Sequence, residues 1–236
     1  MRNKPIPNLS EADKALARSM LIHEDPHILV FDKPSGLPVQ TRGNRGKSVD
    51  YLLWAFARSN GKRPRLVHRI DAGTSGLLVA ARTKPAAAHL SEQFAQRRVR
   101  KTYLALVRGD LPKDTAGQID VSLEKRLGER GQPPMIVGDG PKAQSALTHW
   151  KIVKRAGDIA LIEARPKTGR MHQIRVHLAH LGCPILGDTH YGAGKLSAPR
   201  LMLHAYRLVV EGPTGSLEFE APPHVDMQGL INKLED

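Results

Sequence analysis

The sequence predicts an α+β fold in which a mixed, largely antiparallel central β-sheet is flanked by helices. Many segments have the apolar or alternating pattern of strands, three or four have the spacing of helices, and no regular strand-helix-strand repeat runs along the chain. The 236 residues suffice to bury a core without metals or disulfides, since the single Cys183 has no internal partner.

Residues 1–22 are predicted to form a polar tail that precedes a single domain of residues 23–236. This tail contains Pro5 and Pro7 and too little apolar sequence to pack against a core. One short helix is expected within it from Ser10 onward.

The first half of the domain alternates between strand-like and helix-like segments. Short apolar or alternating runs predict strands at 27–32, 76–82 and 101–109. Apolar residues at helical spacing predict helices at 48–59 and 84–98, the second capped by Thr83 and opened by Pro85.

The second half begins with the least regular stretch, residues 109–145, in which glycines and prolines indicate a flexible insertion or a set of short hairpins. Strands are then expected at 145–155, 159–166, 201–210 and 215–222. Between them, 172–182 is expected to be a helix with Ile174, Leu178 and Leu181 as its apolar stripe and Gly182 at its end.

The formal net charge of +13 makes nucleic acid the leading class of partner. Basic residues gather in the runs 42–47, 62–65 and 97–101, as a surface that follows a phosphate backbone requires. Each run alone is equally consistent with a solvated basic face. Only 4% of the residues are aromatic, which does not favour a sheet that stacks successive bases.

A first candidate site lies in LVHRIDAGTSGLLVAART, residues 66–83. Arg69 and Asp71 would point the same way on an extended backbone, and a carboxylate kept charged by a guanidinium can act as nucleophile or base. The following AGTSG allows a tight turn at which a substrate can approach the backbone. Spacing alone favours a simpler interpretation, a surface ion pair before a strand.

A second candidate site is KTGRMHQIRVH, where Arg170 precedes a helix that contains Arg175, with His172 one turn back on the same side. A helix N-terminus behind Lys167, Thr168 and Gly169 suits a phosphate, and ordinary capping with solvated arginines explains the pattern equally well.

Four histidines invite a metal interpretation, namely His172, His177, His180 and His204. They lack the HExxH pattern, and His177 falls on the apolar stripe of its helix, so a satisfied core histidine is the better explanation there. No metal site is expected.

Four segments in this order and spacing resemble the RluA-type pseudouridine synthases from about residue 23 to 222: HEDPHILVFDKPSGLPVQ, HRIDAGTSGLLVAART, RKTYLALVRG and KTGRMHQIRVHLAHLGCPILGD. The resemblance implies the pseudouridine synthase fold with a catalytic cleft, and makes residues 23–236 the catalytic domain. It also implies an isomerase that cleaves the bond between uracil and ribose in RNA, turns the base and rejoins it through carbon.

The resemblance further implies roles for individual residues. Asp71 matches the catalytic aspartate, and Arg69 is similar to the arginine that occupies the space left by the flipped nucleotide. Tyr103 matches the tyrosine that packs on the uracil, and Arg175 the arginine that pairs with the catalytic carboxylate. The remaining motif residues are expected to bind substrate: His68, Arg170 and His172.

These assignments fit the chemistry expected of the residues. Ordinary glycosidases use two carboxylates, whereas an isomerisation that retains both fragments consumes no water and needs no second carboxylate to activate one. A stacked base must also be extruded before a side chain reaches its glycosidic bond. No cofactor is expected, because the reaction requires none and no dinucleotide or P-loop motif is present.

The expected partner is structured RNA, ribosomal or transfer, and neither DNA nor a membrane. The protein is expected to be cytoplasmic, because no apolar run approaches the roughly 20 residues of a membrane span and no signal peptide opens the chain. It is also expected to be a monomer. Larger family members carry an extra RNA-binding domain before the catalytic region, so target choice here is expected to rest on the catalytic domain.

Two other functions remain open at this point, an RNA-binding or RNA-folding protein without turnover and a metal-dependent hydrolase that uses the histidines. The catalytic interpretation makes a sharper claim. Arg69 and Asp71 are not mainly each other's partners: Arg69 faces the RNA, and Arg175 holds Asp71.

Overall fold

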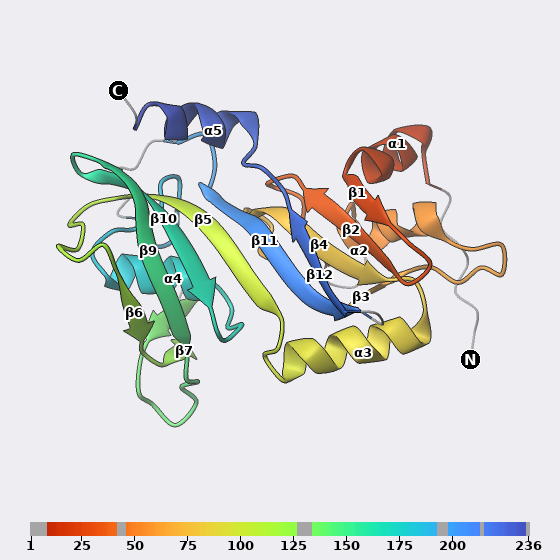
Figure 1. Cartoon of the computed structure of the whole chain (residues 1–236), viewed down its shortest axis with the longest axis horizontal. Helices are drawn as coiled ribbons and strands as arrows, with labels where there is room; N and C mark the ends of the chain where they lie inside the picture. The colour runs from red at the N-terminus through yellow and green to blue at the C-terminus, as the bar shows by residue number, and fades with distance from the viewer. Residues whose placement is uncertain (1–8, 42–45, 127–133, 193–197, 213–214, 235–236) are drawn as a thin grey trace. The chain divides into compact units, whose positions relative to one another are not determined.

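The computed structural model describes residues 9–41, 46–126, 134–192, 198–212 and 215–234. The chain divides into two compact units (Figure 1). Unit 1 comprises residues 1–99 and 210–217, and unit 2 comprises residues 100–209 and 218–236.

Unit 1 is built on a small antiparallel sheet with β2 at its middle. Its strands are β1 (Leu21–Glu24), β2 (Ile28–Lys33), β3 (Arg65–Leu66) and β4 (Ser75–Ala81). β2 pairs with β1 and with β4, in a register that sets Ile28 opposite Ala81 and Lys33 opposite Gly76, while β3 pairs with the end of β4. Every residue of β4 is buried, as its uninterrupted apolar run predicts for a strand covered on both faces.

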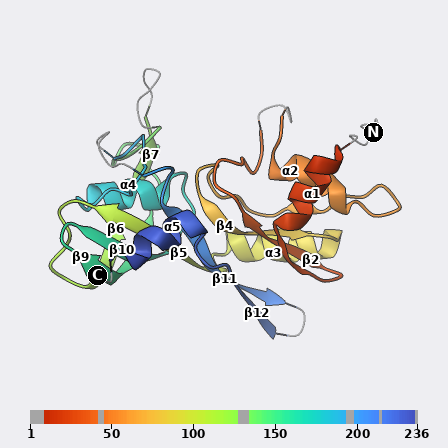
Figure 2. The ribbon, with the colours of Figure 1, turned by 90° about the horizontal axis from the view of Figure 1, so that it is seen from above.

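The helices of unit 1 are α1 (Glu11–Ser19), α2 (Val49–Leu52) with the 3₁₀ turn η2 (Leu53–Phe56), and α3 (Lys84–Ala95). The hydroxyl of Thr83 accepts a hydrogen bond from the Ala86 N–H, so Thr83 caps α3 as expected. α1 lies next to α2, and α3 runs along β4 (Figure 2).

Unit 2 is built on an antiparallel sheet in the order β11-β5-β10-β9-β6. Its strands are β5 (Arg100–Arg108), β6 (Ala116–Asp120), β9 (Leu147–Ala156), β10 (Ile159–Pro166) and β11 (Leu203–Gly212) up to Val209. β11 also pairs with β12 (Gly215–Glu220), of which residues 218–220 belong to unit 2. The middle of β5 is fully buried, with Leu106 opposite Leu161 of β10 and Ala105 opposite Leu203 of β11.

Four further elements complete unit 2. β7 (Leu123–Lys125) and β8 (Met135–Val137) form a separate two-stranded sheet. α4 (Gln173–His180) packs against β8 and β10, and α5 (Val225–Asn232) buries Met227 and Ile231 in the core. The irregular region 109–145 therefore contains short strands, as one of its two interpretations predicts.

The α+β prediction is confirmed, and every strand pairing within each unit for which a register is given is antiparallel. The view that residues 1–22 have too little apolar surface to pack is wrong for residues 9–22. Leu9, Ala17 and Met20 are at most 6% exposed: Ala17 is buried within α1, and Leu9 and Met20 flank its two ends. The expected helix at 48–59 is real but shorter, ending at Phe56.

None of the helices in the described part of the chain combines the length and apolar character needed to cross a membrane.

Candidate active site

Asp71 lies in unit 1 at the start of a tight turn that leads into β4. The Thr74 N–H donates a hydrogen bond of 3.1 Å to the Asp71 carbonyl oxygen, which closes the turn over Ala72 and Gly73. The Asp71 side chain is half-buried. The turn predicted from AGTSG is therefore present and places the carboxylate at the end of a rigid strand.

The loop 33–36 holds this turn through Lys33, whose side chain is fully buried. Its Nζ donates hydrogen bonds to the carbonyl oxygens of Pro34, Leu37 and Ala72 at 2.8, 2.8 and 3.0 Å. An ammonium group has three donors, so these bonds satisfy all of them. Sequence analysis treats KPSG as a turn and misses Lys33.

Two more hydrogen bonds join the same loop to the same turn. The Ser35 hydroxyl donates to the Gly73 carbonyl oxygen at 2.6 Å, and the Gly36 N–H donates to the Ala72 carbonyl oxygen at 2.8 Å. Gly36 has φ +86°, a conformation that favours glycine. The backbone on the C-terminal side of Asp71 is thus fixed from one side by a separate loop.

Arg69 is exposed, and among the residues that the structure describes its side chain has no hydrogen-bond or ion-pair partner. The alternative of a surface ion pair between Arg69 and Asp71 is therefore wrong. The sharper claim, that these two are not mainly each other's partners, is confirmed. An unpaired guanidinium is available to an anionic ligand.

His68 makes its observed contacts within unit 1. Its ring stacks on Phe94 of α3 with centroids 4.4 Å apart, and its Nε2 accepts a hydrogen bond of 2.9 Å from the Val79 N–H of β4. The accepting nitrogen carries no proton, so the neutral ring holds its proton on Nδ1. These contacts give His68 a positioning role beside the Asp71 loop, and its predicted contact with substrate stays a prediction.

In unit 2, Gln173 organises the segment before α4. Its Oε1 accepts from the Thr168 hydroxyl and the Arg170 N–H, and its Nε2 donates to the Leu147 carbonyl oxygen and the Thr148 hydroxyl, at distances from 2.6 to 3.0 Å. Gln173 is 4% exposed. Sequence analysis misses this residue, although it lies inside the quoted KTGRMHQIRVH motif.

Arg170 and His172 lie just before Gln173 in the chain. The Arg170 Nε donates to the Ser145 carbonyl oxygen at 3.1 Å, which leaves its terminal nitrogens available. His172 has φ +54° at the N-cap of α4, and its Nδ1 forms a hydrogen bond of 2.9 Å with the Tyr191 hydroxyl. Both residues are half-buried.

Arg175 forms a bidentate ion pair with Asp188, a residue that sequence analysis misses. Its Nε and Nη2 donate to the two Asp188 carboxylate oxygens at 2.8 Å each, and both residues are buried. The ring of Tyr191 lies 5.1 Å from the guanidinium carbon and adds a cation–π contact. Arg175 is therefore held in one orientation.

The pKa of Asp188 is lowered although burial alone acts to raise it. Hydrogen bonds and charge from Arg175 outweigh the burial, helped by the N–H groups of His190 and Tyr191. Asp188 thus stays ionised in a buried position, where it can orient Arg175.

Tyr103 lies on β5, opposite Ala164 of β10 and Ala205 of β11. It is half-buried and packs against the core of unit 2. Both of its neighbours across the strands are alanines. Nothing observed tests its predicted contact with uracil.

The four histidines considered for a metal site do not gather into one group in the described part of the chain. His172 binds Tyr191, the Nε2 of His204 lies 2.9 Å from the Ala221 carbonyl oxygen, and His180 is exposed. His177 is fully buried, but among the described residues neither ring nitrogen has a hydrogen-bond partner. The prediction of a core histidine is thus right about burial, and the Val121 backbone is the polar group that acts on its ring.

Burial lowers the pKa of His177 to about 4, the Val121 backbone opposing the shift. Burial also raises the pKa of the Cys183 thiol to about 11. A neutral, buried thiol is a poor nucleophile. Neither group is suited to the chemistry of the candidate site.

The predicted site residues fall into two sets. His68, Arg69 and Asp71 belong to unit 1, and the remainder, Tyr103, Arg170, His172 and Arg175, belong to unit 2. The expected pairing of Arg175 with Asp71 joins the two sets and stays a prediction. Of the basic run 42–47, residues 42–45 lie outside the described residues.

Comparison with known proteins identifies related sequences. A family model described as RNA pseudouridylate synthase matches residues 27–180. The chain is 36% identical over 219 residues to the ribosomal large subunit pseudouridine synthase C of Rickettsia bellii, with 89% of this chain and 71% of the relative covered. It is 36% identical over 208 residues to the dual-specificity RNA pseudouridine synthase RluA of Escherichia coli, with 86% and 92% covered.

A solved structure is similar as well. Human RNA Pseudouridylate Synthase Domain Containing 4 superposes with a TM-score of 0.80 at 26% sequence identity, covering 95% of this chain and 97% of that one. The matched region of the family model contains all three residues of the first set and all four of the second.

Proposed function

Because the chain belongs to the RNA pseudouridylate synthase family, it is an RNA-modifying isomerase, and we propose that it converts uridine to pseudouridine in ribosomal RNA with Asp71 as the catalytic carboxylate. The observation that carries the proposal is the turn at Asp71. Three hydrogen bonds from the loop 33–36 fix Ala72 and Gly73, so the preceding carboxylate is presented from a rigid backbone.

One carboxylate suffices for the proposed reaction. Asp71 acts on the nucleotide while the uracil is detached, turned and rejoined through carbon, and both fragments stay in the site. No water is consumed, so a second carboxylate that activates water is not needed.

Access to the glycosidic bond requires the uridine to leave its stack. Arg69 is suited to fill the space that the base vacates, since its guanidinium is exposed and has no partner among the described residues. A planar guanidinium also stacks on bases and binds phosphates.

The residues of unit 2 complete the proposal. Tyr103 packs on the turned uracil, and Arg175 supplies a cation to the carboxylate of Asp71. Its bidentate pair with Asp188 supports this role, because a held guanidinium loses little side-chain entropy when it meets a further anion. Arg170 and His172 are proposed to contact the RNA around the target base.

Ribosomal RNA is the proposed substrate because relatives at 36% and 38% identity, from Rickettsia bellii and Zymomonas mobilis, are named ribosomal large subunit pseudouridine synthases. The Escherichia coli relative is named as having dual specificity. Transfer RNA is therefore the second substrate to test. The net charge of +13 supports binding to either polyanion.

The proposal is tested with purified wild type and Asp71→Asn, each incubated with a transcript of large-subunit ribosomal RNA and, separately, with a transfer RNA pool. Pseudouridine is read by chemical labelling and primer extension. Asp114→Asn is the matched control, because Asp114 is exposed and has no partner among the described residues.

Wild type and Asp114→Asn are expected to form pseudouridine at the same positions, and Asp71→Asn to form none while it still binds the RNA. Turnover by Asp71→Asn at the wild-type rate would remove Asp71 from the mechanism. If no variant converts any uridine although all bind RNA, the alternative of an RNA-binding or RNA-folding protein without turnover is supported instead.

A further inference from the structure

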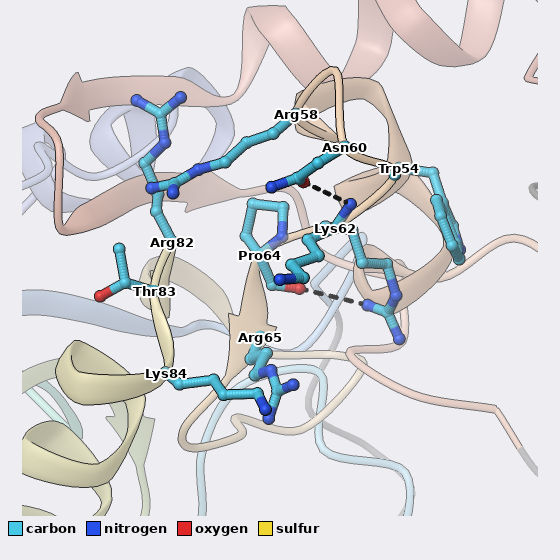
Figure 3. A pocket seen from close by; sticks show the side chains of 11 residues that line it. Trp54, Arg58, Asn60, Lys62, Pro64, Arg65, Arg82, Thr83 and Lys84 are labelled. Carbon is cyan, nitrogen blue, oxygen red and sulfur yellow. Dashed lines mark hydrogen bonds between the residues drawn. The ribbon is translucent and has the colours of Figure 1, made fainter. Parts of the chain in front are cut away.

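A basic pocket lies in unit 1, apart from every residue proposed for catalysis (Figure 3). It has a volume of about 660 Å³ and lies between the loop that follows η2 and the junction of β4 with α3. The lining residues are Trp54, Arg58, Asn60, Gly61, Lys62, Arg63, Pro64, Arg65, Arg82, Thr83 and Lys84. Six of them are lysine or arginine and none is acidic.

Two of these cations are already neutralised by carboxylates. Arg63 forms a bidentate pair with Asp50 at 2.9 and 3.0 Å, and Arg82 pairs with Glu24 at 2.6 Å. These pairs build the wall of the pocket. The net positive charge of the pocket therefore comes from the other cations.

Three cations in the pocket have no partner among the residues that the structure describes. The side chains of Lys62, Arg65 and Lys84 are exposed, and within the described part of the chain none of them reaches a hydrogen-bond acceptor or a carboxylate. Figure 3 shows Arg65 and Lys84 extending toward the same side of the pocket. Three like charges that line one concavity repel each other unless an anion joins them.

The α3 N-terminus adds to this positive potential. Thr83 is the N-cap and Lys84 the first residue of α3, and both line the pocket. The partial positive charge of a helix N-terminus would favour an acidic residue here, yet lysine is present. This choice of residue raises the affinity for an external anion at some expense in helix stability.

The walls also include an aromatic ring. Trp54 is half-buried, and the Arg63 guanidinium covers its ring at 5.4 Å. The pocket volume exceeds what one phosphate fills, so a phosphate together with its sugar or base can enter.

We propose that this pocket binds the phosphate backbone of the substrate RNA, outside the uridine that is modified. The inference rests on the proposed function, which supplies RNA as the polyanion. None of the lining residues is among those proposed to act on the uridine, so the pocket contributes to binding and its loss falls on KM rather than on kcat.

The test replaces two of the three unpaired cations. In Lys62→Gln/Lys84→Gln both replaced side chains are exposed and have no partner among the described residues. The fold is therefore expected to be retained, and a thermal melt checks this. The matched control is Lys113→Gln/Lys142→Gln, which removes the same charge from two exposed lysines of unit 2 that also lack partners among the described residues. The probe is a fluorescently labelled fragment of large-subunit ribosomal RNA.

Fluorescence anisotropy over a series of salt concentrations gives Kd and its salt dependence. Lys62→Gln/Lys84→Gln is expected to raise Kd about tenfold at 0.1 M salt and to lower the slope of log K against log salt by about 1.4, since each phosphate contact of a single strand adds about 0.7. The control is expected to change Kd less than threefold.

A second readout is local to the pocket. The chain has two tryptophans, so in Trp150→Phe the fluorescence comes from Trp54 alone. RNA is expected to change this fluorescence in a saturable way, with the midpoint shifted about tenfold when the two lysines are also replaced.

Equal effects of the two double variants on Kd and salt slope, or an unchanged Trp54 signal, would overturn the proposal. Failure of the proposed function is distinguishable from this outcome. If no uridine is converted by any variant but Lys62→Gln/Lys84→Gln still weakens RNA binding selectively, the pocket stands and the assigned reaction falls.

Discussion

The Nζ atom of Lys33 donates a hydrogen bond of 3.0 Å to the carbonyl oxygen of Ala72, the residue that follows Asp71. This contact joins positions that are 39 residues apart in the chain. It fixes the backbone of the turn without using the carboxylate itself.

Lys33→Met is therefore expected to damage both stability and activity. The carbonyl oxygens of Pro34 and Leu37 lose the Lys33 donor in a buried site, and that of Ala72 keeps only the Gly36 N–H, which together costs about 3 kcal/mol of unfolding free energy. The displaced Asp71 lowers kcat about a hundredfold. Urea unfolding and single-turnover assays measure the two effects, and Lys113→Met, at an exposed position, is expected to change neither. Unchanged turnover in Lys33→Met would show that the loop does not position Asp71.

The pair of Arg175 and Asp188 predicts a second effect on stability. Asp188→Asn leaves a buried guanidinium without its counter-ion and is expected to lower the unfolding free energy by about 3 kcal/mol. The double variant Arg175→Met/Asp188→Leu removes both charges and is expected to be more stable than Asp188→Asn. Chemical denaturation of wild type, Asp188→Asn and Arg175→Met/Asp188→Leu measures the three unfolding free energies. A double variant that is less stable than Asp188→Asn would contradict the prediction.

The hydrogen bonds of Gln173 can be tested by substitution. Gln173→Met leaves the Thr168 hydroxyl proton and the Arg170 N–H without their acceptor, while the Leu147 carbonyl oxygen keeps the Lys167 N–H, and the change is expected to cost about 3 kcal/mol. Gln118→Met is the control, because Gln118 is exposed on β6. Equal unfolding midpoints for the two variants would show that the hydrogen bonds of the Gln173 side chain do not stabilise the fold.

His177 predicts how stability depends on pH. Its pKa is about 4 in the folded protein and 6.5 for an ordinary histidine, so the unfolded chain binds more protons between these values. Stability from this residue is complete above about pH 6.5 and falls as the pH drops toward 4, by about 2 kcal/mol between pH 7 and pH 5.

His177→Leu is expected to flatten this part of the stability curve, as urea unfolding at pH 7 and pH 5 will show. His180→Gln is the matched control, since His180 lies exposed at the end of the same helix. A curve for His177→Leu as steep as that of wild type would contradict the assignment.

The strands and most helices follow from sequence because their signals are local. The apolar run 76–82 predicts β4, Thr83 predicts the start of α3, and Gly182 predicts where the helix containing Arg175 ends. The turn after Asp71 is likewise a property of neighbouring residues.

What sequence analysis misses depends on the path of the chain in space. Lys33 reaches a residue 39 positions away, and Asp188 meets Arg175 across 13 residues that include an irregular turn. No periodicity encodes either contact. The burial of Ala17 within α1 and of Met20 at its end likewise depends on where the helix lies, because a few apolar side chains suffice when they face a core.

The turn after Asp71 and the side chain of Arg175 are each held by residues of their own unit. Lys33, Ser35 and Gly36 hold the first within unit 1, and Asp188, Tyr191 and Gln173 hold the second and its surroundings within unit 2. A substitution in one set leaves the other set intact. Directed evolution toward new RNA targets is therefore expected to be able to vary one unit while the hydrogen bonds that hold the other are kept.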